Sequence, residues 1–131
     1  MSVCSIVTAN SNSGSACIEE LFARKDYCDK VNVRGVFRSA EKAEPFAKKY
    51  PTLEICTGVD ASKPETLNKA FVGAEKAFIV TVHDYNRGFA EDAKLTKNMI
   101  LAAVEAGVKY IVLVASWTVK DCVRLSGLAA R

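Results

Sequence analysis

A run of small polar residues near the N-terminus has the composition of a phosphate-binding turn. Residues 8–15 read Thr-Ala-Asn-Ser-Asn-Ser-Gly-Ser, and they join an apolar run to a segment of helical period. Small residues let a backbone approach a phosphate, and the following helix offers free N–H groups and the positive end of its dipole. The hydroxyl groups of Ser11, Ser13 and Ser15 are further candidate donors. Because Gly14 is the only glycine in the turn, a polar capping loop without a ligand is the alternative interpretation.

A single basic residue, Arg38, follows the second apolar run of the chain. In a sheet of parallel strands covered by helices, the tip of the second strand faces the adenosine ribose of a bound dinucleotide. An acidic residue there binds the 2′-hydroxyl of NAD, and a basic residue accommodates the 2′-phosphate of NADP. Arg38 is therefore a candidate selector for NADP, with an exposed surface arginine as the alternative.

Other residues with chemical potential stand near the ends of later apolar runs. His83 and Asp84 could serve acid–base catalysis as an imidazole beside a carboxylate, although we favour a polar loop. Ser116 could contact the nicotinamide side of a ligand or cap a helix. Cys17 could be a reactive thiol at a helix N-terminus, but we expect it in the core.

Five short apolar runs rich in β-branched residues have the length of strands. They are Val3–Thr8, Val31–Phe37, Leu53–Val59, Ala77–Val82 and Tyr110–Ser116. They are apolar on both faces, as buried parallel strands are, and segments of helical period lie between them. This alternation predicts an α/β fold: a doubly wound parallel sheet of about five strands in the order 3-2-1-4-5, with helices on both faces.

Turn and cap residues support these boundaries. The segment Ser62–Glu65 has the spacing of a capping box, which predicts the start of a helix after the third strand. Gly73 and Gly107 stand where helix C-caps belong. Tyr50-Pro51 ends the helix expected from Ser39.

Length and composition predict one globular domain over residues 1–131. Half of the residues are hydrophobic, and 18 Lys and Arg against 15 Asp and Glu give a net charge of +3 without a basic run, so we expect no nucleic acid partner. No stretch is long enough to span a membrane. Five cysteines without a C-x-x-C spacing, and one histidine, predict reduced thiols in the cytoplasm and no metal site. The helical pattern of Val119–Arg131 stops without a cap, a turn or a sixth strand, so we expect a chain cut inside a larger architecture, either a fragment or an unusually short gene product.

The whole chain resembles the NmrA-like branch of the atypical short-chain dehydrogenases/reductases. The turn of that family reads G-A-T-G-x-x-G, and Thr8, Ser11 and Gly14 fall on its three glycines while Ala9 falls on its alanine. The family's T-R after the second strand matches Phe37-Arg38. Further blocks of the family match at Gly58–Leu67, Gly73–Thr81 and Ala102–Val112.

This resemblance implies an NADP(H)-binding Rossmann domain of an oxidoreductase or of a redox-sensing regulator, with NADP favoured over NAD. It implies that the cofactor phosphates lie on the first turn, the 2′-phosphate on Arg38 and adenine near Asp60 and Ala61. Thr81, Val82 and Ser116 would line the path toward nicotinamide. The resemblance also implies that the missing part is a C-terminal substrate-binding part. The cofactor-binding residues that it implies are Thr8, Ala9, Asn10, Ser11, Asn12, Ser13, Gly14, Arg38, Asp60, Ala61, Thr81, Val82 and Ser116. The chain has no Tyr-x-x-x-Lys pair after the fifth strand, so catalytic residues are not identified and enzymatic activity stays open.

Two alternatives stand beside the dinucleotide-binding hypothesis. One is a flavodoxin-like module for FMN, which would order its strands 2-1-3-4-5. The other is a non-enzymatic domain that has lost the cofactor and binds a protein. An exposed fifth strand with Val112, Val114 and Trp117 would favour a homodimer or another protein partner.

Overall fold

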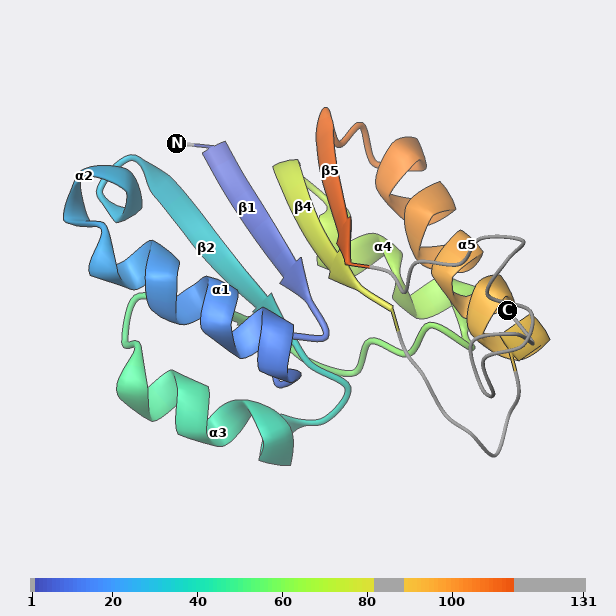
Figure 1. The fold of residues 1–131 in the computed structure, drawn as a ribbon, viewed down its shortest axis with the longest axis horizontal. Helices are drawn as coiled ribbons and strands as arrows, with labels where there is room; N and C mark the ends of the chain where they lie inside the picture. The colour runs from blue at the N-terminus through green and yellow to red at the C-terminus, as the bar shows by residue number, and fades with distance from the viewer. Residues whose placement is uncertain (1, 82–88, 115–131) are drawn as a thin grey trace, which may run out of the picture.

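The sheet has the strand order that the sequence predicts. The structure is a computed structural model that describes residues 2–81 and 89–114. Its strands are β1 (Ser2–Val7), β2 (Val31–Val36), β3 (Glu54–Cys56), β4 (Ala74–Val80) and β5 (Tyr110–Val114). They form one parallel sheet in the order β3-β2-β1-β4-β5 (Figure 1). This order confirms the doubly wound prediction and contradicts the flavodoxin-like alternative, in which β3 would lie beside β1.

Helices cover both faces of this sheet. Helices α1 (Asn12–Ala23) and α3 (Ala40–Lys49) lie on one face, and α4 (Asn68–Phe71) and α5 (Phe89–Glu105) lie on the other (Figure 1). A short helix, α2 (Lys25–Cys28), which the apolar pattern does not predict, follows α1. No helix among residues 2–81 and 89–114 has the length and apolar character of a membrane span.

Alternation along the strands divides the core into two layers. Cys4 and Ile6 of β1 pack toward α1, where Ile18 is fully buried. Val7, the residue after Ile6, faces the opposite side, where it joins Phe71 of α4 and Met99 of α5. Successive strand side chains point to opposite faces, so each strand contributes to both layers.

Two strands differ in extent from the sequence expectation. Strand β3 covers only Glu54–Cys56; within the described part of the chain it pairs with β2 alone, and Gly58 with φ +72° turns the chain out of the extended conformation. Strand β4 begins at Ala74, directly after the left-handed Gly73. Apolar runs identify where a strand lies, but its ends depend on which neighbours supply hydrogen bonds.

The predicted C-cap at Gly107 is confirmed in detail. Gly107 has φ +84°, its N–H donates to the Val104 carbonyl at 3.1 Å, and the Val108 N–H donates to the Ala103 carbonyl at 3.1 Å. This pair of bonds is the Schellman motif, which ends a helix most easily at a glycine. It fixes the point at which α5 turns toward β5.

The predicted capping box at Ser62 is wrong. The Ser62 hydroxyl donates to Asp60 Oδ1 at 2.6 Å, and the helical segment begins as a 3-10 turn, Pro64–Thr66, that has no side-chain cap. Helix α4 then covers only Asn68–Phe71. The reason is a competing local interaction. The Asp60 carboxylate also accepts the Ser62 N–H at 2.9 Å, so Ser62 is part of an Asx turn with Asp60 and its hydroxyl does not cap the following helix.

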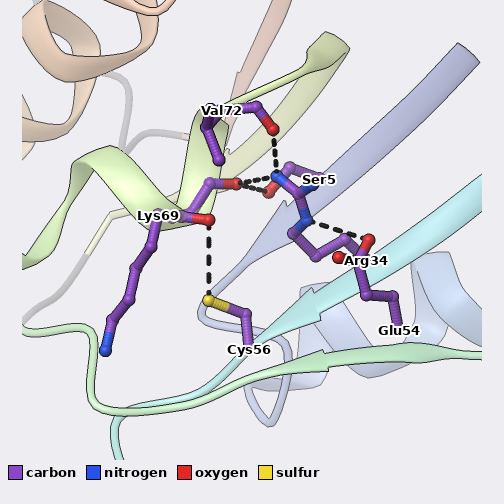
Figure 2. A network of polar contacts seen from close by, with 7 residues as sticks. Ser5, Arg34, Glu54, Cys56, Lys69 and Val72 are labelled. Carbon is purple, nitrogen blue, oxygen red and sulfur yellow. Dashed lines mark hydrogen bonds and ion pairs between the residues drawn. The ribbon is translucent and has the colours of Figure 1, made fainter.

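A buried arginine anchors the short helix α4 to the sheet (Figure 2). Arg34 of β2 is 6% exposed, and its Nη1 donates to the carbonyls of Ala70 at 3.0 Å and Val72 at 2.9 Å. Its Nε donates to Glu54 Oε2 at 3.0 Å, and the Ser5 hydroxyl donates to the same Ala70 carbonyl at 2.7 Å. The end of α4 is thus held by side chains from β1 and β2, next to the loop that follows β3.

Candidate functional site

The turn after β1 adopts the conformation that glycine normally supplies. Thr8 has φ +59° and is the only non-glycine residue with positive φ among the described residues. A side chain in this region costs roughly 1–2 kcal/mol. The Thr8 hydroxyl donates to the Val80 carbonyl at 3.1 Å, and the Ala9 N–H donates to the Val36 carbonyl at 3.1 Å. The turn is therefore bonded to the ends of both neighbouring strands, which compensates for the threonine.

Ser11, at the second glycine position of the resembled family, caps helix α1. Its Oγ accepts the Gly14 N–H at 3.0 Å and donates to the Thr8 carbonyl at 2.7 Å. The Ser15 hydroxyl donates to the Asn12 carbonyl at 3.2 Å. These two hydroxyls bond to the local backbone, which differs from their expected role as donors to a ligand. Because the Gly14 N–H is bonded to Ser11 Oγ and the Ser15 N–H donates to the Ser11 carbonyl at 2.8 Å, the donors that the first helical turn offers are the N–H groups of Asn12 and Ser13.

Gly14 allows α1 to lie close to the turn. A Cβ atom at this position would lie 2.5 Å from the Thr8 carbonyl oxygen and 2.9 Å from the Ala9 Cα. Both neighbours are backbone atoms, so a side chain does not fit. This is the role that the third glycine plays in a dinucleotide-binding turn, where it permits close packing of helix on strand.

A cavity of about 280 Å³ opens beside this turn, at the carboxyl ends of β1, β2 and β3. We call it the strand-tip cavity. Apolar side chains form much of its wall, and polar and charged residues from three loops complete it. Its lining residues are Val7, Thr8, Asn10, Val36, Arg38, Ser39, Lys42, Val59, Asp60, Ala61, Leu67, Leu95 and Met99.

Two charged side chains meet at the strand-tip cavity. Arg38 Nη2 lies 3.6 Å from Asp60 Oδ2, and the arginine side chain is 73% exposed while that of Asp60 is 23% exposed. The hydrogen bond from the Ser62 hydroxyl, aided by the Ser62 N–H and by the charges of Arg38 and Lys63, holds the pKa of Asp60 below its ordinary value. The cavity therefore contains a stable carboxylate next to an accessible guanidinium group.

Lys42 is a lining residue that sequence reasoning missed. It lies in the first turn of α3, whose N-cap Ser39 accepts the Lys42 N–H through its side chain at 3.4 Å. A signal was present in the sequence, because Lys42 follows Arg38 by four residues across a helix start. Only the helix geometry shows that both basic side chains line one cavity.

The remaining predicted site residues have different positions. Ala9 is fully buried, and Asn12, Ser13 and Gly14 form the start of α1 without lining the cavity. Thr81 follows β4 and donates its N–H to the Val114 carbonyl at 3.2 Å, away from the cavity wall. Val82, His83, Asp84 and Ser116 lie outside the described residues. Within the described ranges, no group of three acidic, cysteine or histidine side chains could hold a metal ion.

The cysteines near the turn behave as core thiols. Burial raises the pKa of Cys4 to about 11, with further contributions from Cys17 and, in the opposite direction, from Lys76. Burial also raises the pKa of Cys17. Both thiols are protonated at neutral pH, which agrees with the expectation that Cys17 belongs to the core.

A parallel sheet in this order, with a cavity at its carboxyl edge and a glycine-dependent turn before α1, defines the class of doubly wound nucleotide-binding domains. A profile of NAD(P)H-binding domains matches residues 9–128. The chain therefore belongs to the NAD(P)H-binding family, which confirms the expected NAD(P)-binding Rossmann domain.

Solved structures with the same fold include reductases and a regulator. Triphenylmethane reductase from Citrobacter sp., complexed with NADP(H), is 26% identical with a TM-score of 0.72, over 86% of this chain and 36% of that one. An NADPH-dependent quinone oxidoreductase from Escherichia coli, complexed with NADPH, is 23% identical with a TM-score of 0.68, over 86% of this chain and 36% of that one. NmrA, a negative transcriptional regulator, is 20% identical with a TM-score of 0.67, over 86% of this chain and 33% of that one.

The chain spans about a third of the length of these structures. The likeness to the quinone oxidoreductase and to NmrA shows the fold alone. No curated protein matches the chain by sequence.

Proposed function

We propose that this chain is the NADP(H)-binding domain of an oxidoreductase and that it binds NADP(H) more tightly than NAD(H). The observation that carries the proposal is the presence of Arg38 and Lys42 on one wall of the strand-tip cavity. Two basic side chains at the tip of the second strand suit the 2′-phosphate that distinguishes NADP from NAD. The NADP(H) bound to the similar Citrobacter reductase supports the same cofactor.

The described residues fit the adenosine half of the cofactor. Adenine would lie against the apolar wall near Asp60 and Ala61, and the pyrophosphate would accept hydrogen bonds from the first turn of α1. The glycine-like conformation of Thr8 and the close packing at Gly14 support this placement. When bound, the cofactor supplies hydride transfer, and the chain supplies binding and orientation.

Calorimetric titration with NADPH, NADH and FMN tests the proposal, and we expect the tightest binding for NADPH. Each charge-assisted hydrogen bond to a 2′-phosphate is worth about 1.5–3 kcal/mol. Arg38→Ala should therefore weaken NADPH binding roughly tenfold or more and leave NADH binding almost unchanged. Lys42→Ala should act in the same direction. The matched control is Lys48→Ala, because Lys48 lies on the same helix but pairs with Glu44 outside the cavity.

A second pair of substitutions tests the turn. Thr8→Gly should relieve the cost of the left-handed conformation, and Ser11→Gly should cost only a few tenths of a kcal/mol as a cap. The double variant should bind both nucleotides more tightly, because glycine leaves room for the pyrophosphate where Thr8 and Ser11 carry side-chain atoms. Equal affinity of the unmodified protein for NADPH and NADH would contradict the NADP preference. Absence of binding, even in the double variant, would leave only the protein-interaction alternative.

The proposal also includes a protein partner, with a second copy of the chain as the first candidate. The support is the edge strand β5, where Tyr110 and Val112 are 61% and 58% exposed. The free thiols of Cys4, Cys17 and Cys56 support a reducing compartment such as the cytoplasm.

A further inference from the structure

We propose that Asp60 opposes Arg38 in selecting the cofactor: its carboxylate engages the guanidinium group that a 2′-phosphate needs, and it thereby limits the preference for NADP(H) over NAD(H). This inference rests on the proposed function. A carboxylate beside Arg38 was not expected from the second strand, where the nearest acidic residue in sequence is Glu41. The sheet supplies one from the loop after β3.

Backbone hydrogen bonds bring the two loops together. The Phe37 N–H donates to the Cys56 carbonyl at 2.8 Å, and the Val59 N–H donates to the Phe37 carbonyl at 3.4 Å. These bonds extend the pairing of β2 with β3 past the ends of both strands. Arg38 and Asp60 therefore lie beside each other on the wall of the strand-tip cavity, with 3.6 Å between Nη2 and Oδ2.

The carboxylate is fixed more firmly than the guanidinium group. Asp60 Oδ1 accepts both the N–H and the hydroxyl of Ser62, at 2.9 and 2.6 Å, and the Asp60 N–H donates to Thr66 Oγ1 at 2.9 Å. The other oxygen, Oδ2, faces Arg38. Because the Arg38 side chain is 73% exposed and its contact with Asp60 is long, the arginine can reorient at low cost while the aspartate cannot.

This geometry predicts unequal effects on the two nucleotides. A 2′-phosphate that recruits Arg38 must compete with Asp60 for the guanidinium group, and it brings its own negative charge close to a fixed carboxylate. A 2′-hydroxyl brings no charge and does not need the guanidinium group, so we expect Asp60 to leave the binding of NAD(H) almost unaffected. An exposed ion pair of this kind changes an equilibrium by up to about fivefold.

The test replaces the charge and retains the turn. Asp60→Asn keeps an oxygen that can accept both bonds from Ser62, so the loop is expected to stay folded. Calorimetry would measure NADPH and NADH, and also 2′,5′-ADP and 5′-AMP, which differ from each other only by the 2′-phosphate. We expect the ratio of NADPH affinity to NADH affinity to rise about threefold to fivefold. The ratio of 2′,5′-ADP affinity to 5′-AMP affinity should rise by a similar factor.

A double-mutant cycle with Arg38→Ala separates charge competition from repulsion. The effect of Asp60→Asn on NADPH should be larger when Arg38 is present, because only then is a guanidinium group released. Glu41→Gln is the matched control: it removes one charge from an exposed residue that does not line the cavity, and it should leave both ratios unchanged. If the Asp60→Asn variant does not fold, the same affinity ratios are measured on Asp60→Ser, whose shorter side chain still offers a hydroxyl oxygen that can accept a hydrogen bond in the turn.

The outcomes distinguish the two proposals. A ratio that stays within about twofold, or that falls, overturns the role of Asp60 while the proposed function stands. Equal weakening of NADPH and NADH would show a purely structural effect and would also overturn it. If the unmodified protein binds none of the four compounds, the proposed function fails and this inference fails with it.

Discussion

At Gly14, the absence of a side chain decides whether α1 can lie against the turn after β1. A Cβ atom would lie 2.5 Å from the Thr8 carbonyl oxygen and 2.9 Å from the Ala9 Cα. Both are backbone atoms, which cannot move aside as the end of a flexible side chain can. The same turn contains the left-handed Thr8 and the N-cap Ser11. One missing methyl group therefore supports the conformation of the whole turn between β1 and α1.

Gly14→Ala should lower the free energy of unfolding by about 3 kcal/mol, at the upper end of overpacking costs. Gly73→Ala is the control, because a Cβ atom there has no neighbour within 4 Å. The only expected loss of unfolding free energy comes from the positive φ of +74° and is roughly 1–2 kcal/mol. Chemical denaturation followed by circular dichroism measures both variants. Equal losses for the two variants would contradict the steric role of Gly14.

Asp60 should make a small contribution to stability that depends on pH. The bonds from Ser62, followed by the charge of Arg38, lower the pKa of Asp60 in the folded state, and partial burial opposes them. A lowered pKa means stabilisation that is present above the ordinary value of 3.8 and is lost as pH falls through the lower folded value. Asp60→Asn should remove this dependence. Unfolding measured between about pH 2.5 and 7 checks it, and parallel curves for the two proteins would refute it.

At the scale of elements, Arg34 explains how a helix as short as α4 keeps a defined position. An isolated helix of this length does not form in water. Here its last carbonyl groups are bonded to Arg34 Nη1, and the Ser5 hydroxyl shares one of them. The network in Figure 2 therefore fixes the connection between β3 and β4, which also forms part of the strand-tip cavity.

Arg34→Met should lower the free energy of unfolding by about 2 kcal/mol, since it leaves the Val72 carbonyl without its arginine partner while Ala70 keeps Ser5. Glu54→Gln is the matched control. It removes the other partner of Arg34, but Glu54 is half-exposed, so we expect a loss below about 1 kcal/mol. Thermal or denaturant unfolding measures both, and a larger loss for Glu54→Gln would contradict the anchoring role of the carbonyl bonds.

At the scale of the whole molecule, β5 forms the edge of the described sheet and carries apolar side chains that are open to solvent. Tyr110 and Val112 are both more than half exposed, and an edge strand also offers unpaired backbone groups. We expect the protein to self-associate through this strand as its concentration rises.

Val112→Lys should shift the protein toward the monomer, because a charge on an edge strand opposes pairing. The control is Val72→Lys, which places the same charge on an equally exposed apolar position after α4, 53% exposed, away from β5. Analytical ultracentrifugation over a range of concentrations measures the effect. A protein that is monomeric at every concentration would contradict the prediction.

The sequence by itself determined the fold class, because alternating apolar periods identify five parallel strands joined by crossover helices. It favoured the strand order 3-2-1-4-5 but left the flavodoxin-like order 2-1-3-4-5 open, since right-handed crossovers build both, and the pairing of β3 with β2 decided between them. It also predicts roles for Arg38 and Gly14 from a position relative to one strand or one turn; the structure places Arg38 at the strand-tip cavity and gives Gly14 its close packing. These features are local, and local periodicity is present in the chain before it folds.

Only the tertiary structure decided how residues from separate loops combine. Asp60 reaches Arg38 because β3 lies beside β2, and Lys42 joins the same cavity because α3 begins directly after Arg38. Thr8 keeps a glycine conformation because the ends of two other strands bond to its turn. Ser62 bonds to Asp60 instead of capping a helix. Such outcomes depend on competition among long-range partners, and a pattern along one chain contains no information on which partner is nearest.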